Sequence, residues 1–219
     1  MQVIRVVVVD DEALARSGFG LILNAAPGIE VVATASGAEA LAVVGEHEPH
    51  VVLLDVRMPD VDGLTVLAGL RALPEPPVVA MLTTFDADEY VLTALHSGAA
   101  GFLLKDTEPE HLAQYVRTLA AGGVVMSRRA SRTLLSGLPA GPAAGLEAPA
   151  RVERLTGPER EVLVLLAEGL TNAEIGAETR VPAGTVADQV AALLAKLRVS
   201  SRVQAALLAE RAGLLDGRP

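Results

Sequence analysis

Five residues of types that could bind and transfer a phosphoryl group lie at the ends of short apolar runs. Each either follows such a run or is its last residue. They are two adjacent acids (Asp10 and Asp11), a third acid (Asp55), a hydroxyl (Thr83) and an ammonium (Lys105). Clustered carboxylates repel one another unless a cation lies among them, and an all-oxygen site suits Mg²⁺ or Mn²⁺. With a hydroxyl and an ammonium to contact phosphoryl oxygens, one carboxylate could attack phosphorus. The residue types therefore indicate phosphoryl transfer.

The order of elements explains how residues so far apart could meet. Continuous Val and Leu runs indicate strands buried on both faces, and their alternation with segments of helical period predicts a parallel sheet wrapped by helices. We expect strands at 3–9, 29–33, 51–54, 78–82 and 101–104, and helices at 13–25, 37–47, 63–73, 88–97 and 108–121. The fold class is therefore α/β, a doubly wound, flavodoxin-like sheet of five parallel strands. Its carboxyl edge would gather the five residues in one pocket.

Four motifs along this half resemble the receiver domains of NarL/FixJ-type response regulators. The motifs are Asp10-Asp11, the stretch from Asp55 to Gly63, Leu82-Thr83-Thr84, and the stretch from Gly101 to Asp106. The resemblance implies that a sensor histidine kinase phosphorylates the chain in the cytoplasm. It also implies that the protein is a regulator rather than an enzyme.

The resemblance also implies a role for each pocket residue. Asp55 would be the phosphoacceptor, and the Mg²⁺ ligands would be Asp10, Asp11, Asp55 and the backbone carbonyl of Arg57. Thr83 and Lys105 would contact phosphoryl oxygens, and Thr83 with Phe102 would form the switch. A phosphatase of the haloacid dehalogenase type also uses an Asp nucleophile with Mg²⁺, but it needs a second Asp where this chain has Arg57.

The second half of the chain has a different composition and a helical pattern throughout. Gly, Pro and Ala dominate 136–150 and indicate a linker. We place the receiver at 1–125, a linker with a possible short helix (127–135) at 126–150, and an output domain at 151–219. Thr156 and Thr171 each stand three residues before a Glu, which is the capping-box spacing. Helices are expected to start near 157 and 172 and to span 183–197 and 201–212.

Motifs between 155 and 208 resemble the LuxR-type four-helix helix-turn-helix domain, which implies transcriptional control through DNA binding. In that family the helix 183–197 would enter the major groove. Its apolar stripe at i, i+4, i+7 and i+11 predicts the core face: Val186, Val190, Leu193 and Leu197. The candidate DNA contacts are Thr171, Asn172, Thr185, Gln189, Lys196 and Arg202.

The charges leave a second interpretation of the output domain open. Residues 1–125 hold 6 Lys/Arg against 17 Asp/Glu, so any contact with DNA phosphates is expected in the second half of the chain. Residues 151–219, however, hold 9 Lys/Arg and 9 Asp/Glu and so carry no net positive charge. Where the LuxR family usually has Lys-x-His, this chain has Ala187, Asp188 and Gln189. Typical DNA readers are basic. The domain either binds DNA weakly, as a homodimer formed on phosphorylation, or has kept the scaffold for protein–protein interaction. No run is long enough to span a membrane.

Overall fold

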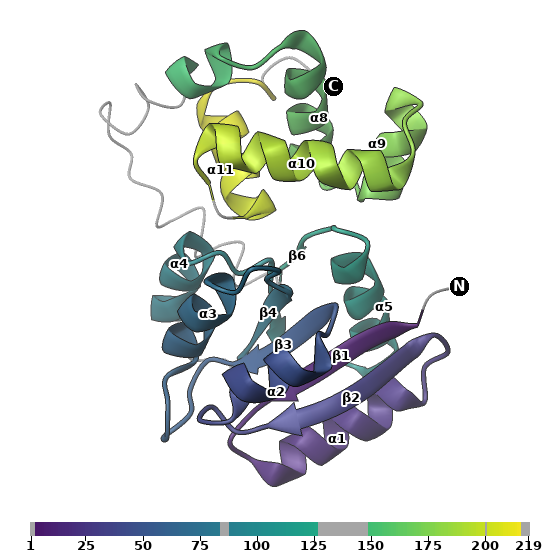
Figure 1. Ribbon diagram of the computed structural model, residues 1–219, viewed down its shortest axis with the longest axis vertical. Coiled ribbons are helices and arrows are strands. Elements are labelled where there is room, and N and C mark those ends of the chain that lie inside the picture. Colours follow the sequence, from purple (N-terminus) through teal and green to yellow (C-terminus); the bar gives the residue numbers. More distant parts are fainter. Residues whose placement is uncertain (1–2, 84–87, 127–148, 200, 216–219) are drawn as a thin grey trace.

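The computed structural model describes residues 3–83, 88–126, 149–199 and 201–215, which form two domains. In Figure 1 the N-terminal α/β domain lies below, and an all-helical domain lies above it. The helix expected at 127–135 and most of the expected linker lie outside the described residues. Residues 149–153 are helical, and Val152 packs into the core of the upper domain. Within the described ranges, no helix combines the length and the apolar character that crossing a bilayer requires.

A parallel sheet forms the centre of the N-terminal domain. Its strands are β1 (Ile4–Val9), β2 (Ile29–Ala35), β3 (Val51–Asp55), β4 (Val78–Thr83), β5 (Gly101–Leu104) and β6 (Val125–Met126). They lie in the order β2-β1-β3-β4-β5-β6. The expectation of five strands was wrong by one. The two-residue β6 pairs with β5 through Gly101 and Phe102 at the edge of the sheet, and so short a segment has no periodicity from which to predict it.

Five helices cover the two faces of this sheet. They are α1 (Ala13–Asn24), α2 (Ala40–His47), α3 (Gly63–Arg71), α4 (Asp88–His96) and α5 (Pro109–Ala120). Helices α1 and α5 pack on one face with Val6, Val8 and Leu53. Helices α2, α3 and α4 pack on the other with Val7, Val9 and Leu54. Because successive side chains of a strand point to opposite faces, runs such as Val6–Val9 must be apolar throughout to fill both layers. This confirms the predicted doubly wound α/β class.

The upper domain consists of four described helices after the helical segment at 149–153. They are α8 (Gly157–Ala167), α9 (Asn172–Thr179), α10 (Ala183–Leu197) and α11 (Arg202–Arg211). The predicted apolar stripe of α10 is buried at all four positions, together with Leu163 and Ile175. Helices α9 and α10 are joined by a short turn in which Arg180 adopts φ 60°, and they form the helix-turn-helix.

Both predicted capping boxes are present. The Thr156 hydroxyl accepts the backbone N–H of Glu159, and the Glu159 carboxylate accepts the backbone N–H of Thr156. Thr171 and Glu174 repeat the arrangement at the start of α9. Glu159 has one further partner, because Lys196 Nζ lies 2.6 Å from Glu159 Oε2 and ties the end of α10 to the start of α8. Lys196, a candidate DNA contact, therefore also has a structural role.

The carboxyl of Glu159 should titrate near pH 2 in the folded protein. Lys196 chiefly, and then Thr156, lower its pKa from 4.5 to about 2. Because the folded-state pKa lies below the unfolded one, the stabilisation is present above about pH 4.5 and is lost as the pH falls toward 2. Carboxyl-resolved NMR titration would measure the midpoint. Lys196→Ala should raise the titration midpoint of Glu159. The midpoint of Glu174 should not change, because its pKa is lowered by Thr171 instead. An unchanged Glu159 midpoint in this variant would contradict the assignment.

Candidate functional site

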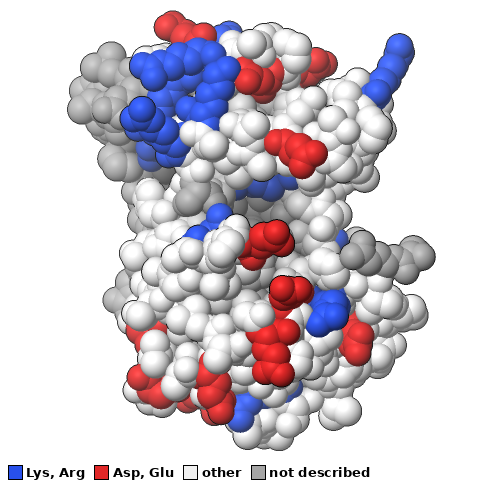
Figure 2. All heavy atoms as spheres, viewed as in Figure 1, with Lys and Arg blue, Asp and Glu red and all other residues white. Residues whose placement is uncertain are grey.

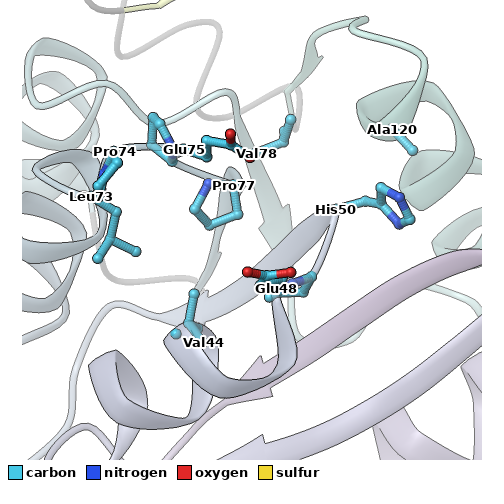
Figure 3. Close-up of a pocket in the computed structure, with 12 residues that line it drawn as sticks. Val44, Glu48, His50, Leu73, Pro74, Glu75, Pro77, Val78 and Ala120 are labelled. Carbon is cyan, nitrogen blue, oxygen red and sulfur yellow. The ribbon is translucent and has the colours of Figure 1, made fainter.

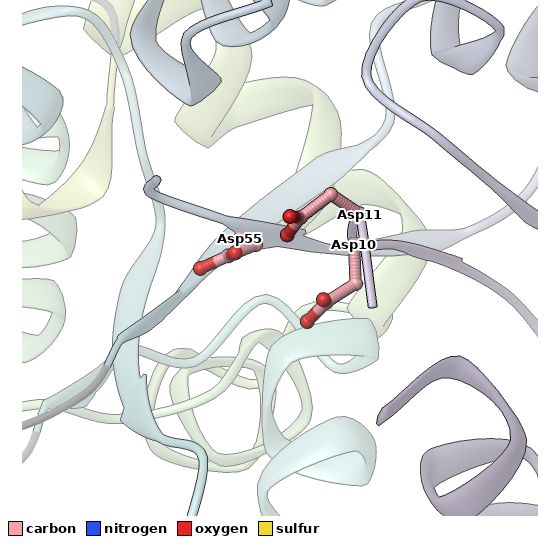
Figure 4. A group of neighbouring side chains, drawn as sticks. All are labelled: Asp10, Asp11 and Asp55. Atoms are coloured by element: carbon pink, nitrogen blue, oxygen red, sulfur yellow. The ribbon is translucent and has the colours of Figure 1, made fainter. Parts of the chain in front are cut away.

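The five predicted pocket residues stand at the carboxyl edge of the sheet. Asp10 directly follows β1, Asp55 ends β3, Thr83 ends β4 and Lys105 directly follows β5. In the parallel order β1-β3-β4-β5 these ends are neighbours, which is why residues from four distant segments can meet. One carboxylate oxygen from each of Asp10, Asp11 and Asp55 lies within 4.8 Å of the other two. Figure 4 shows the three side chains grouped where their strands end.

The pocket is buried and holds a bridging cation. Asp10, Asp55 and Thr83 have exposed fractions of 0%, 4% and 6%. Lys105 Nζ lies 2.7 Å from Asp10 Oδ2 and 3.0 Å from Asp55 Oδ2. A buried carboxylate is costly without such a partner, and losing one member of a buried pair leaves the other uncompensated. The pocket is therefore preorganised around one ammonium.

Burial and charge act in opposite directions on the two titrating groups of this pair. Burial raises the pKa of Asp55, and the ammonium of Lys105 only partly opposes the rise. For Lys105, burial alone would lower the pKa, but its contacts with Asp10 and Asp55 outweigh burial, so the pKa is raised. Lys105 therefore stays protonated at neutral pH and supplies a fixed positive charge.

The donor set fits a divalent cation. All three acids offer oxygen, the ligand type that Mg²⁺ prefers. Asp10 Oδ2 is fully buried, and the Lys105 ammonium lies 2.7 Å from it. One ammonium shared between two buried carboxylates leaves negative charge that a divalent cation could neutralise. Asp11 is more exposed than Asp10, which leaves the pocket open to solvent on that side. Arg57 lies two residues beyond Asp55, and its backbone N–H donates to Asp55 Oδ1 at 3.4 Å.

Two side-chain contacts near the pocket were missed by the sequence analysis. The Arg16 guanidinium donates to the backbone carbonyls of Asp10 (2.6 Å) and Asp11 (3.1 Å), and so holds the turn that carries both acids. The Arg57 guanidinium lies 5.7 Å from the ring centroid of Tyr90, which links the loop after β3 to α4. Neither contact has a sequence signal, because each depends on where two separate elements pack.

The predicted switch residues lie on neighbouring strands. Thr83 pairs in register with Leu104 of β5, and Phe102 pairs with Met81 of β4. Phe102 is fully buried, in the same apolar cluster as Leu95 of α4 and Val56 beside the pocket. A change at the pocket can therefore reach α4 through continuous packing.

A hollow also lies at the opposite edge of the sheet. It has a volume of about 730 Å³ and is lined by Val44, Glu48, His50, the proline-rich loop 73–78 and Ala120 (Figure 3). The imidazole of His50 has a structural contact, since its Nδ1 accepts the backbone N–H of Arg5 at 2.9 Å. Ligands of parallel sheets bind at the carboxyl edge, so the acidic pocket is the better functional candidate.

The candidate DNA contacts fall into two groups. Thr185 and Gln189 are exposed on α10, beside the exposed Ala187 and Asp188, and Lys196 is exposed near its end. Thr171, Asn172 and Arg202 lie instead where the two domains meet. Figure 2 shows acidic side chains spread over the lower domain and the largest basic group on the upper one, which agrees with the division of charge in the sequence.

Comparison with known proteins assigns both halves of the chain. Residues 6–117 match the response regulator receiver domain, and residues 153–209 match the bacterial regulatory proteins of the luxR family. The fold and the acidic pocket thus define a receiver joined to a helix-turn-helix. The chain belongs to the two-component response regulators that combine a receiver with a LuxR-type DNA-binding domain, a family of transcriptional regulators and not of enzymes.

Several relatives are similar along nearly their whole length. The DNA-binding transcriptional activator DevR/DosR of Mycobacterium tuberculosis is 37% identical, over 94% of each chain. The nitrate/nitrite response regulator NarL of Escherichia coli is 34% identical, over 92% of this chain and 93% of its own. The crystal structure of ChrA, a response regulator of a heme-sensing two-component system, covers 98% of this chain and all of its own at 29% identity and a TM-score of 0.53. These relatives support the DNA-binding interpretation rather than the protein-binding alternative.

Proposed function

We propose that a sensor histidine kinase phosphorylates this regulator on Asp55, and that the phosphorylated chain pairs as a homodimer and binds DNA to control transcription. The observation that carries the proposal is the buried bridge of Lys105 between Asp10 and Asp55. An ammonium held within 3.0 Å of two carboxylates neutralises charge at the point where phosphoryl oxygens would arrive.

The pocket residues divide the chemistry among them. An Asp55 oxygen attacks phosphorus while the bond from phosphorus to the donor's imidazole nitrogen breaks, and an acyl phosphate forms. Lys105 and the Thr83 hydroxyl bind phosphoryl oxygens. Mg²⁺, when held by Asp10, Asp11, Asp55 and the Arg57 carbonyl, would neutralise the developing charge. The low accessibility of Asp55 limits the access of bulk water to the acyl phosphate.

The output domain would bind DNA with few positively charged side chains. Thr185 and Gln189 stand on the exposed face of α10 and could approach base edges, as Gln does with adenine. Lys196 is paired with Glu159 and so has only part of its charge available to phosphates. Asp188 is exposed on the same helix and would repel phosphates. Two output domains on one site would compensate for the weakness of each, since the second contact is then intramolecular.

DNA binding by the full-length protein should require phosphorylation and should weaken steeply with salt. We expect a gel shift only after treatment with acetyl phosphate and Mg²⁺, on fragments enriched from genomic DNA by the treated protein. Ala187→Lys combined with Asp188→Ala should tighten binding about tenfold at low salt, and less at high salt, because it removes a repulsive charge and adds an attractive one. Thr65→Lys combined with Glu75→Ala, both at exposed positions of the receiver, makes the same change of two charge units away from α10 and controls for charge alone. Failure of the phosphorylated protein to enrich any sequence, together with capture of a protein partner, would favour the alternative output.

A further inference from the structure

The positive charge of the output domain is concentrated on one part of its surface. Residues 151–161 and 196–198 hold 5 Lys/Arg against 3 Asp/Glu, whereas the rest of 151–219 holds 4 against 6. The largest basic group in Figure 2 lies on the side of the upper domain where Figure 1 shows the helical segment at 149–153. The zero net charge of the domain therefore conceals a basic surface.

Two contacts with backbone carbonyls bring four arginines together on this surface. The guanidinium of Arg151 donates to the carbonyl of Leu197, the last residue of α10, at 3.5 Å. The guanidinium of Arg160, on α8, donates to the carbonyl of Val152 at 3.3 Å. A further arginine follows each of these two carbonyls within two residues. We call the four residues the arginine cluster, of which the first is half-buried and the others are exposed: Arg151, Arg154, Arg160 and Arg198.

The arginine cluster lies at one end of an exposed stripe on α10. The stripe consists of residues at i, i+4, i+7 and i+11, which share one side of a helix: Thr185, Gln189, Ala192 and Lys196. Lys196, at the end of the stripe, is bound to Glu159, which directly precedes Arg160 of the cluster. The phosphate backbone borders the major groove on both sides. Side chains around the end of α10 can therefore reach phosphates while the start of the same stripe lies over base edges.

The chemistry of these side chains suits DNA phosphates. A guanidinium stays charged and carries five N–H donors in a planar fork that matches a phosphate, so a contact with one carbonyl does not exclude it from binding one. Four guanidinium groups on one surface repel one another, and a polyanion would relieve this repulsion. The side of α10 opposite its buried stripe offers instead the acid Asp188.

We propose that the arginine cluster binds the phosphate backbone of DNA beside the groove that α10 enters, and so supplies the positive charge that the exposed face of α10 lacks. The proposal rests on the proposed function, DNA binding by the output domain. Phosphate contacts position a protein on the duplex and carry no direct sequence information. The arginine cluster therefore sets the affinity and its dependence on salt, while Thr185 and Gln189 set the sequence preference.

Removal of two exposed arginines should weaken DNA binding without changing its sequence preference. Arg154→Gln combined with Arg198→Gln keeps polar side chains but removes two charges from each protomer, and four from a homodimer. Each phosphate contact adds about 0.9 to the slope of log K against log salt, so the slope should fall by about 3 to 4. The affinity at about 0.1 M salt should fall at least tenfold, equally for fragments enriched from genomic DNA and for random duplex. Fluorescence anisotropy on the full chain, treated with acetyl phosphate and Mg²⁺, would measure both quantities.

Two comparison variants separate charge from position and from base contacts. Thr65→Glu combined with Ala68→Glu makes the same change in net charge at exposed positions of α3 and should alter the slope by less than about one. Gln189→Ala changes no charge. It should keep the slope but reduce the preference for enriched over random duplex by about tenfold.

Affinity cleavage would test the position of the arginine cluster directly. The sequence contains no cysteine, so Arg198→Cys provides one attachment point for an iron chelate that cleaves DNA close to it. We expect cuts in the backbone at the borders of the site that the protein protects. The same chelate attached to Ala68→Cys, on the receiver, should give no cuts.

Each outcome bears on a separate claim. If the parent binds specific DNA and the double arginine variant keeps its slope and affinity, the inference is overturned although the proposed function stands. If the parent enriches no sequence yet loses its binding to random duplex in the double variant, the sequence-specific function fails and the role of the cluster is supported. Absence of binding to any duplex at low salt would overturn both. If the double variant no longer dimerises in sedimentation experiments without DNA, the cluster binds the acidic receiver of a second copy instead, and the inference is again wrong.

Discussion

The Asp55→Asn protein is expected to accept no phosphoryl group from acetyl phosphate, whereas the parent should become stoichiometrically modified when Mg²⁺ is present. Asn retains the shape of the side chain but lacks the anionic oxygen proposed to attack phosphorus. The substitution also removes one of the three carboxylates proposed to hold the metal. Intact-protein mass spectrometry, which registers the added phosphoryl mass, would measure the result. Chelation of Mg²⁺ should produce the same loss in the parent.

Asp106→Asn is the matched control for this experiment. It makes the same chemical change at an exposed acid beside Lys105 and should leave the modification intact. The variant also tests whether the bridge tolerates a nearby loss of charge. Stoichiometric modification of the Asp55→Asn protein, mapped by peptide analysis to another residue, would show that the nucleophile has been misassigned.

Gly63→Ala is expected to destabilise the receiver by about 3 kcal/mol, at the upper end of the usual cost of overpacking. Gly63 begins α3, and a Cβ there would lie 2.2 Å from the Asp55 carbonyl oxygen and 2.8 Å from that of Val56. Both are backbone atoms at the end of β3, where the proposed phosphoacceptor Asp55 lies, so the conflict cannot be relieved by a side-chain rotation. Chemical denaturation would measure the loss, and the remaining folded protein should be phosphorylated more slowly because Asp55 has moved.

Gly45→Ala is expected to change the stability of the receiver in the opposite direction. Gly45 lies inside α2 and is exposed, and a Cβ added there would meet nothing within 4 Å. Ala is favoured over Gly in a helix interior, so this variant should gain up to about 1 kcal/mol. A similar loss in both variants would mean that the close approach at Gly63 does not govern the effect.

The acids of the output domain are not all placed on α10, the helix proposed to approach DNA. Its acids include Glu159 and Glu174, whose carboxylates are engaged in capping boxes at helix starts. The exposed acid on α10 is Asp188. The Ala187→Lys, Asp188→Ala variant therefore changes the charge of α10 itself, while it leaves the helix caps of α8 and α9 unchanged.

The sequence by itself determined the features that depend on local pattern. Continuous apolar runs such as Val6–Val9 predicted a parallel sheet, and the acids after β1 and β3 predicted the pocket, because parallel strands end at one edge. Capping boxes at Thr156 and Thr171 and the buried stripe of α10 were confirmed for the same reason: their partners lie three, four or seven residues away.

Only the tertiary structure decided the features whose partners are distant in sequence. The edge strand β6 exists because β5 offers it a free side, although its two residues carry no periodic signal. Arg16 reaches the turn at Asp10 and Asp11 because α1 folds back on the sheet. Gln204 meets α4 across more than a hundred residues. Periodicity encodes which face of an element is buried. The element against which that face packs depends on the tertiary structure, and the contact between the domains therefore had no sequence signature.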